Sequence, residues 1–174
     1  MACLLTQGFT IDCINSVGGV KTLYVADFND LTTAPTITAG AVTAMTLATG
    51  KKFWTYKLEK QNASAVQSLK KSVENGTVYY EAKYDFNLKK MSVASQNELT
   101  LLAQNRLLII HLDNNGKYWL FGVNAGCDLI TNEGTSGKAF GDLNGYTASI
   151  TGMEAAMWYE VPSAIIATLT VPAV

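Results

Sequence analysis

The clearest periodic pattern of apolar and polar positions lies near the middle of the chain, over residues 93–105. Leu99 and Leu102 recur at helical spacing on one side of this segment, and polar residues occupy the other side. Ser95 is followed three residues later by Glu98, which is the pattern of a capping box, but Ser92 is an equally suitable N-cap. The segment is therefore predicted to be a helix with two candidate residues for its N-terminal cap.

A β-hairpin is predicted directly after this helix. Residues 107–112, with the sequence Leu-Leu-Ile-Ile-His-Leu, are apolar on both alternating faces, which is typical of a strand covered on both sides. Residues 113–116 include the Asn and Gly that tight turns favour, because these residues tolerate a positive φ. Residues 118–121 then return as the partner strand. We expect the helix and this hairpin to form the nucleus of the core.

Most of the remaining chain has the alternation of β-strands. It is cleanest over residues 77–88, where the even-numbered positions from Val78 to Phe86 are apolar or aromatic. Further strands are predicted at residues 9–14, 21–28, 36–49, 53–58, 146–152, 154–161 and 164–171, and a loop-rich segment at residues 124–144. The predicted fold is α+β and β-dominated: an antiparallel β-sandwich or barrel with one flanking helix, in a single domain spanning residues 1–174.

Residues 61–76 do not follow this alternation. They are rich in Ala, Ser, Gln and Asn, and their few larger apolar residues fall near helical spacing. A structureless segment of this length inside a compact domain is usually functional or disordered. We therefore predict an interaction loop at about residues 61–76, which docking on a neighbouring copy orders as a short amphipathic turn. The predicted subunit-interface residues are Lys60, Val66, Leu69, Lys70, Lys71 and Val73.

The composition is that of a globular protein with little charge. Apolar residues make up 48% of the chain and charged residues only 16%, with a formal net charge of −1. A balanced charge argues against a dedicated nucleic-acid-binding protein, which would carry a basic excess. The charge is nevertheless uneven, because residues 51–90 contain nine Lys against four acidic residues. This is consistent with a basic segment of one copy meeting an acidic surface of the next, and equally with an ordinary solvated hairpin.

The cysteines and the first residues bear on where the protein is made. Cys3, Cys13 and Cys127 are odd in number and lack CxxC spacing, which favours unpaired thiols in a reducing compartment over disulfides or a zinc site. Residues 1–10 lack the basic n-region and apolar core of a signal peptide. No apolar run approaches the roughly 20 residues that span a bilayer. We expect synthesis in the cytoplasm and no membrane partner.

No residue pattern predicts catalytic chemistry. The single histidine, His111, lies among apolar strand residues and is predicted to be a hydrogen-bonded core residue. Residues 134–139 resemble a phosphate-binding loop, but the first Gly and the Ser or Thr after Lys138 are both absent. Asp142 and Asn144 lie in a predicted turn that lacks the further carboxylates of a calcium loop. We therefore expect no enzyme activity, no cofactor and no metal.

Two stretches of the chain resemble virion proteins of tailed bacteriophages, especially those of phages that infect Bacteroidetes. The first is the early strand pair FTIDC (residues 9–13) and GGVKTLY (residues 18–24). The second is GDLNGYTASITGME (residues 141–154), which resembles the GD-x-NGY-x-x-x-x-x-G-x-E endings of tail-tube-like proteins. The order of elements is also similar, with a long insertion between two strands and one helix in mid-chain. The family resembled is that of tail-tube-like or tail ring structural proteins.

This resemblance implies a β-sandwich or barrel assembled into homo-oligomeric rings, whose sheets join into the wall of a DNA channel with an acidic or neutral lining. The implied partners are further copies of the chain, both within a ring and between stacked rings, and other virion proteins. DNA is a further implied partner, which passes through the channel without specific contacts. The implied location is the tail or neck of the virion, after assembly in the host cytoplasm. Capsid decoration and tail completion are alternative phage roles. A monomeric ligand-binding β-barrel is a further alternative.

Overall fold

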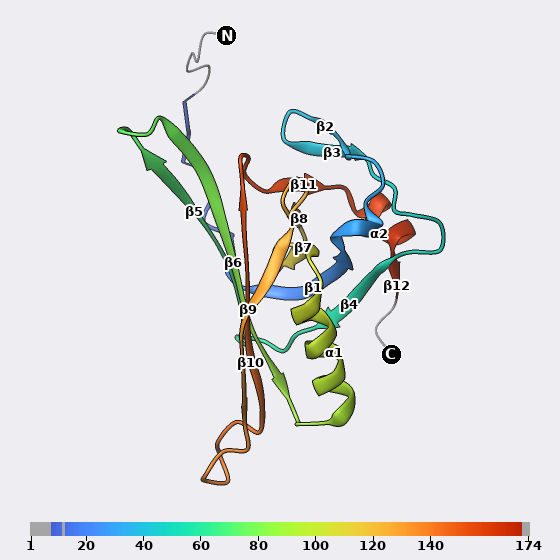
Figure 1. The fold of residues 1–174 in the computed structure, drawn as a ribbon. Helices are drawn as coiled ribbons and strands as arrows, with labels where there is room; N and C mark the ends of the chain where they lie inside the picture. The colour runs from blue at the N-terminus through green and yellow to red at the C-terminus, as the bar shows by residue number, and fades with distance from the viewer. Residues whose placement is uncertain (1–7, 12, 172–174) are drawn as a thin grey trace.

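The computed structural model describes residues 8–11 and 13–171, and one twelve-stranded sheet dominates it (Figure 1). Its helices are α1 (Val93–Gln104) and α2 (Ser163–Leu169), with a 3-10 turn, η1 (Phe28–Asp30). Its strands are β1 (Val20–Asp27), β2 (Thr36–Thr38), β3 (Ala41–Ala44), β4 (Phe53–Lys57), β5 (Ala63–Ser72), β6 (Thr77–Lys89), β7 (Leu107–Asp113), β8 (Tyr118–Phe121), β9 (Cys127–Thr135), β10 (Gly145–Glu154), β11 (Tyr159–Val161) and β12 (Thr170–Val171).

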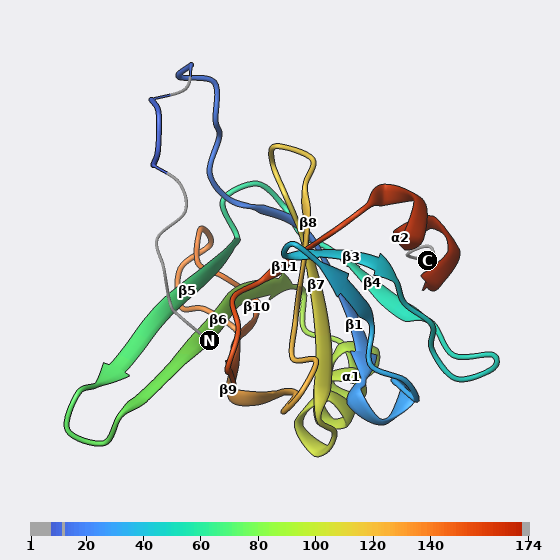
Figure 2. The same cartoon turned by 90° about the horizontal axis from the view of Figure 1, so that it is seen from above.

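The sheet is mixed and strongly bent. Its strand order is β2-β3-β11-β8-β7-β9-β10-β6-β5, and β1 pairs with both β7 and β4. All pairs are antiparallel except β3–β11 and β4–β12, which are short and parallel. Figures 1 and 2 show β5, β6, β9 and β10 as one layer, from which β1, β4, β7 and β8 turn away together with both helices. The predicted β-dominated α+β class is confirmed.

Strand β7 separates two hydrophobic cores. Ile109 faces the first core, which β1, β6, β10 and α1 also line. Ile110 faces the second core, which β3, β4 and α2 complete. The five consecutive residues from Leu107 to His111 are all buried. The prediction of a central strand covered on both sides is therefore confirmed.

The predicted mid-chain helix is present as α1. The Ser92 Oγ accepts a hydrogen bond from the Ser95 main-chain N–H at 3.0 Å, so Ser92 is the N-cap. Leu99 and Leu102 are the buried residues of this helix. At its C-terminal end the Asn105 side chain donates to a main-chain carbonyl of the last turn. Of the two caps that the sequence allowed, the structure uses the one before the first helical residue.

Several predicted segments have a different structure, and three of them form regular elements that were not expected. Residues 36–49 contain a hairpin of β2 and β3, which turns at Ala39 and Gly40 with φ of 50° and 82°. Residues 124–144 contain the nine-residue strand β9. Residues 164–171 are mostly helix α2, because Ile166 and Leu169, three residues apart, both reach the second core. In α2 burial at helical spacing outweighs the β-propensity of Ile and Thr.

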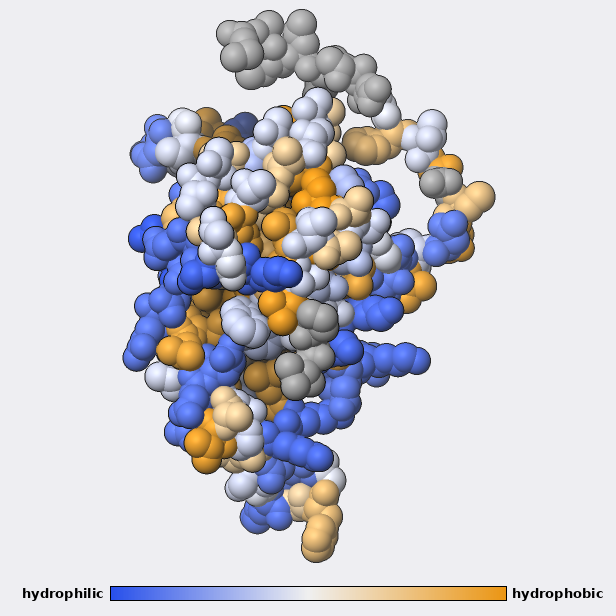
Figure 3. Space-filling view, turned by 90° about the vertical axis from the view of Figure 1, so that its right-hand side faces the viewer, coloured by the Kyte–Doolittle hydropathy of each residue, from blue (hydrophilic) through white to orange (hydrophobic). Residues whose placement is uncertain are grey.

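The expected strand at residues 9–14 does not form within the described residues; Asp12 lies outside them. Phe9 and Ile11 are fully exposed, and no strand of the described chain pairs with this segment. The chain joins the body at Val17, whose main-chain N–H donates to the Asn115 Oδ1 and whose carbonyl accepts from the Asn115 Nδ2. In Figure 3 the coloured residues of this segment stand away from the body.

The segment 61–76, predicted as an interaction loop, is largely strand β5, so the predicted loop conformation was wrong, and the interaction itself stays a prediction. β5 pairs with β6 over ten residues, from Ala63 opposite Phe86 to Ser72 opposite Thr77. Gln61 and Asn62 lie in the turn and bend before this strand, and residues 73–76 form the turn after it. Ala, Ser, Gln and Lys have low β-propensity, but strand propensity depends on context, and the strongly alternating β6 supplies a complete hydrogen-bonded partner.

Candidate functional site

The layer of β9, β10, β6 and β5 has one face on the core and one open face. Ala148, Ile150 and Tyr84 are fully buried on the inner face. Thr147 and Lys83, which alternate with them along the same strands, are exposed. Both helices lie on the inner side of this layer (Figure 1). The outer face is therefore a long sheet surface that no element of the described chain covers.

Small polar and charged side chains dominate this open face. Lys70 pairs with Glu81 at 3.4 Å, and Lys83 pairs with Asp85 at 2.9 Å. The strand register also places Asp128 and Glu133 of β9 on this face, opposite Thr151 and Thr147. The face carries, in addition, Ser64, Val66, Thr131, Ser149 and Met153. Lys89 has the same parity along β6 as Lys83 and pairs with Glu59. Because all three lysines have carboxylate partners, the unpaired charge on this face is negative.

Strand β5 is a free edge of the sheet. It pairs with β6 and with no other strand of the described chain. The Asn87 N–H donates to the Asn62 carbonyl at 3.0 Å, which fixes the phase of the antiparallel ladder. From that phase the main-chain N–H groups of Ala65, Gln67 and Leu69 point away from β6. A long edge with outward N–H and C=O groups is a template for pairing with another strand.

The predicted interface residues all lie on or beside this edge and are all exposed. They do not share one helical face, because β5 alternates. Val66 and Lys70 belong to the open outer face, whereas Leu69 and Lys71 belong to the opposite face. Val73 lies in the turn after β5, and Lys60 in the turn before it. Sequence reasoning therefore located the segment but missed the unpaired edge, whose only sequence signal is a weak alternation of Ala and Gln with Ser and Val.

The stretch that carries the family resemblance lies along β10, and its glycines have a packing role. A Cβ on Gly145 would lie 2.1 Å from the Leu88 carbonyl oxygen, and a Cβ on Gly152 would lie 2.5 Å from the Cys127 Sγ. Its two carboxylates fix neighbouring turns: Asp142 before β10 and Glu154 at its end. These residues are explained by the close fit of β10 to its neighbours.

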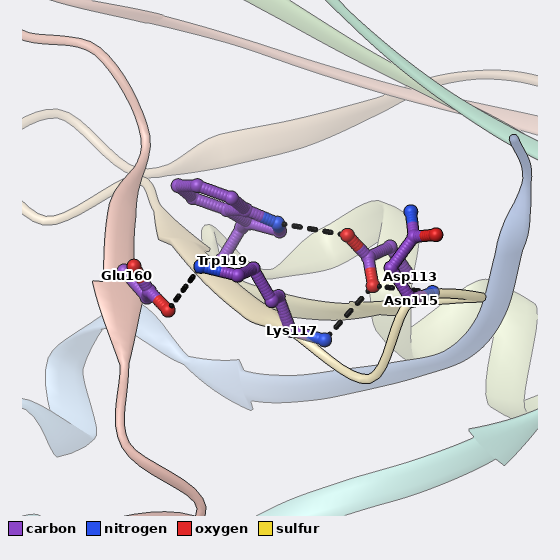
Figure 4. A network of polar contacts seen from close by, with 5 residues as sticks. All are labelled: Asp113, Asn115, Lys117, Trp119 and Glu160. Carbon is purple, nitrogen blue, oxygen red and sulfur yellow. Dashed lines mark hydrogen bonds and ion pairs between the residues drawn. The ribbon is translucent and has the colours of Figure 1, made fainter. Parts of the chain in front are cut away.

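A pocket of about 370 Å³ opens beside the β7–β8 hairpin, where the N-terminal segment joins the body. Its aromatic lining is His111, Trp119 and Trp158. Figure 4 shows the hairpin wall: the Asp113 carboxylate accepts from the Trp119 Nε1 at 3.3 Å and from the Lys117 main-chain N–H at 2.8 Å. The carboxylate of Asp113 thereby stabilises the turn of the β7–β8 hairpin.

His111 is buried as predicted, but its hydrogen-bonding is not as predicted. Its Nδ1 has no hydrogen-bond partner among the described residues. Its ring packs edge-on against Trp158 at 4.7 Å and lies 5.5 Å from the Tyr84 ring. Burial lowers the pKa of His111 to about 4, although the nearby Asp113 charge opposes this shift. In the described part of the chain the neutral imidazole therefore packs between the rings of Trp158 and Tyr84.

Comparison with family models, with curated proteins and with solved structures found no match. Within residues 8–11 and 13–171, no group of three or more His, Cys, Asp or Glu side chains is placed to hold a metal ion. Neither helix of that part of the chain is long and apolar enough to cross a membrane. The open sheet face and its free edge are the surface features that remain to be assigned a function.

Proposed function

We propose that this protein is a structural virion subunit that assembles with copies of itself into a ring or tube, with the open face of the β9–β10–β6–β5 layer lining a channel for DNA. The observation that carries the proposal is the free edge of β5 on a layer that has one uncovered face. A monomer gains nothing from ten residues of unpaired edge, which is a site for aggregation unless a partner strand or a neighbouring copy covers it.

The charge of the open face fits this role. Lysine and arginine hold DNA by neutralising its phosphates, so a conduit that releases DNA should carry few unpaired cations. Lys70, Lys83 and Lys89 on the face all have carboxylate partners, and Asp128 and Glu133 have no lysine partner among the described residues there. The resulting surface repels phosphates weakly and offers small hydroxyl side chains at Thr147 and Thr151.

Assembly is tested first on the purified parent chain at rising concentration, by sedimentation velocity and negative-stain microscopy. Rings or tubes of uniform diameter support the proposal. A chain that remains monomeric at all concentrations contradicts it. Capsid decoration and tail completion rest on the same surfaces, and the diameter and symmetry of the particles distinguish these roles from a tail tube.

The role of the edge is tested by Leu69→Pro. The Leu69 N–H points away from β6, so proline removes a donor from the free edge without removing a hydrogen bond of the β5–β6 ladder. The matched control is Leu69→Ala, which shortens the 58% exposed side chain but keeps the N–H. We expect Leu69→Pro to stay folded and monomeric, and Leu69→Ala to assemble. If Leu69→Pro loses its native circular dichroism, Leu69→Lys tests the same edge by charge.

The pocket beside His111, Trp119 and Trp158 favours one other function, a monomeric ligand-binding protein. Pockets that hold small molecules have volumes of about 300–1,000 Å³ and mostly apolar linings with a few polar groups. The parent measurement separates the two functions, because a ligand-binding monomer sediments as a single small species. Tryptophan fluorescence, with Trp119 and Trp158 in the lining, would report ligand binding directly.

A further inference from the structure

A single phenylalanine is presented to solvent at one end of the open layer. Phe140 is 113% exposed at the tip of the loop between β9 and β10, which forms the lower tip of the molecule in Figure 1. The loop is internally bonded, because the Asp142 Oδ2 accepts from the main-chain N–H groups of Lys138 and Ala139, both at 2.8 Å. The Asp142 N–H donates in turn to the Ala139 carbonyl. The aromatic ring thus stands on an ordered turn with no contact to cover it.

An apolar pocket lies at the opposite end of the same layer. Gly145, where β10 begins beside the Phe140 loop, pairs with Lys89, whereas Glu154, where β10 ends, pairs with Tyr80. The nine residue steps between them span about 30 Å at roughly 3.3 Å per residue. At the far end a pocket of about 360 Å³ is lined by Val78, Tyr79, Met153 and Ala155, together with Asn124, Ala125 and Glu154. Val78 is 49% and Met153 is 55% exposed.

The two ends carry opposite charge. The segments that form the Phe140 end, 88–91 and 136–144, contain Lys89, Lys90 and Lys138 against the single acid Asp142. Lys89 pairs with Glu59, which leaves Lys90 and Lys138 as the cations of this end. The segments that form the pocket end, 70–79, 124–128 and 153–157, contain Glu74, Asp128 and Glu154 against Lys70 and Lys71. Lys70 pairs with Glu81, which leaves Lys71 as the one unpaired lysine against three carboxylates in these segments. Approach of one end to the other is therefore favoured by charge as well as by apolar contact.

We propose that Phe140 of one copy inserts into the Val78–Tyr79–Met153–Ala155 pocket of the next copy. A contact between two different patches is heterologous, so in a pair one copy keeps a free pocket and the other a free Phe140, and the same contact can be repeated by further copies. Because the two patches lie at the two ends of β10, successive copies place their layers in line. The contact gives the proposed tube its axial stacking and rests on that proposed function, but it uses none of the β5 edge.

Photo-crosslinking tests the contact. Benzoylphenylalanine placed at position 140 of the full chain keeps an aromatic group there, and a mixture of light and ¹⁵N-labelled copies identifies crosslinks between copies. We expect crosslinks between copies at residues 78–79 and 153–155. Crosslinks to another surface, such as the groove that Trp54 and Leu101 line beside α1, would overturn the proposal.

A substitution separates this contact from the assembly as a whole. Phe140→Ser removes the aromatic ring, and Ile130→Ser is the matched control, because Ile130 is 61% exposed on the same layer but lies at neither end. We expect the concentration for stacking to rise by about 10- to 100-fold in Phe140→Ser and to stay unchanged in Ile130→Ser. A parent that never assembles overturns the proposed function and this contact together. A Phe140→Ser variant that stacks like the parent overturns the contact alone.

Discussion

The Glu154 carboxylate accepts hydrogen bonds from both the main-chain and the side-chain nitrogen of Asn124, at 2.8 Å each. It also accepts from the Ala125 N–H at 3.0 Å, and the residue is almost fully buried. One side chain at the end of β10 thus holds the turn that leads into β9. The acid at the end of the GDLNGYTASITGME stretch therefore has a structural role in this fold.

We predict that Glu154→Leu destabilises the protein by about 2–4 kcal/mol, because three donors lose a charged acceptor and the turn has no substitute for it. Glu154→Gln should cost less than about 1 kcal/mol, since one amide oxygen still accepts from both main-chain N–H groups. Urea unfolding followed by circular dichroism measures both. Equal losses in the two variants would show that the charge matters and the hydrogen bonds do not.

The close approach of Gly152 to Cys127 gives a second prediction. A Cβ at position 152 would lie 2.5 Å from the Cys127 Sγ and 3.1 Å from the Gly126 carbonyl oxygen. We expect Gly152→Ala to cost about 1–3 kcal/mol through overpacking. Adding Cys127→Ala removes the nearest atom, so the double variant should be more stable than the sum of the two single effects predicts. Purely additive effects in the double-mutant cycle would contradict this explanation.

The N-cap of α1 gives a third prediction. Ser92→Ala removes the acceptor of the Ser95 N–H and should cost about 1 kcal/mol. Ser95→Ala leaves that acceptor in place and should cost less, although the two hydroxyls lie 2.8 Å apart. Thermal unfolding of the two variants side by side distinguishes them. The reverse order of stability would favour the capping box that starts at Ser95.

The fourth prediction concerns the stability of the protein at acidic pH. The pKa of His111 is about 4 in the folded protein, and its ordinary value is 6.5. Below pH 6.5 the unfolded chain binds a proton that the folded chain does not, so the stability that His111 contributes is complete above pH 6.5 and is lost as the pH falls towards 4. The loss should be roughly 3 kcal/mol.

His111 is the only histidine in the sequence, so the variant His111→Gln has no histidine that could titrate. Comparison of this variant with the parent between pH 6.5 and 4.5, above the usual carboxylate range, isolates the contribution of His111. This variant is expected to be less stable at neutral pH, where packing against Trp158 and Tyr84 is lost. Its stability should nevertheless change little across that range. A parent and a variant with the same slope of unfolding free energy against pH would show that His111 is not the titrating group.

Local patterns in the sequence were sufficient to predict the elements whose structure depends on residues close to one another along the chain. The helical spacing of Leu99 and Leu102, the turn residues before Lys117 and the alternation of β6 each predicted the element that the structure contains. The five-residue apolar run at Leu107 correctly placed β7 between two cores. In these segments propensity, periodicity and burial all favour the same structure.

Elements whose structure depends on distant partners were decided only by the tertiary structure. β5 lacks a β-rich composition and becomes a strand because β6 offers it a ladder of ten residue pairs. α2 has strand-forming residues but buries Ile166 and Leu169 in a pocket of the second core that no local pattern reveals. Conversely, residues 9–11 alternate like a strand, but no strand of the described chain pairs with them, although the edge of β5 is free.

The candidate site also combines features that local sequence patterns predict with features that depend on distant segments. The sequence by itself determined a weakly charged, β-rich chain in which no residue pattern indicated catalysis, and it singled out residues 61–76 and 141–154. Only the tertiary structure decided that the first segment is a free edge, and that the second runs between an exposed Phe140 and an apolar pocket at Met153. The physical reason is that exposure, strand register and the distance between the two ends of a sheet are properties of pairs of segments, which spacing along one segment does not encode.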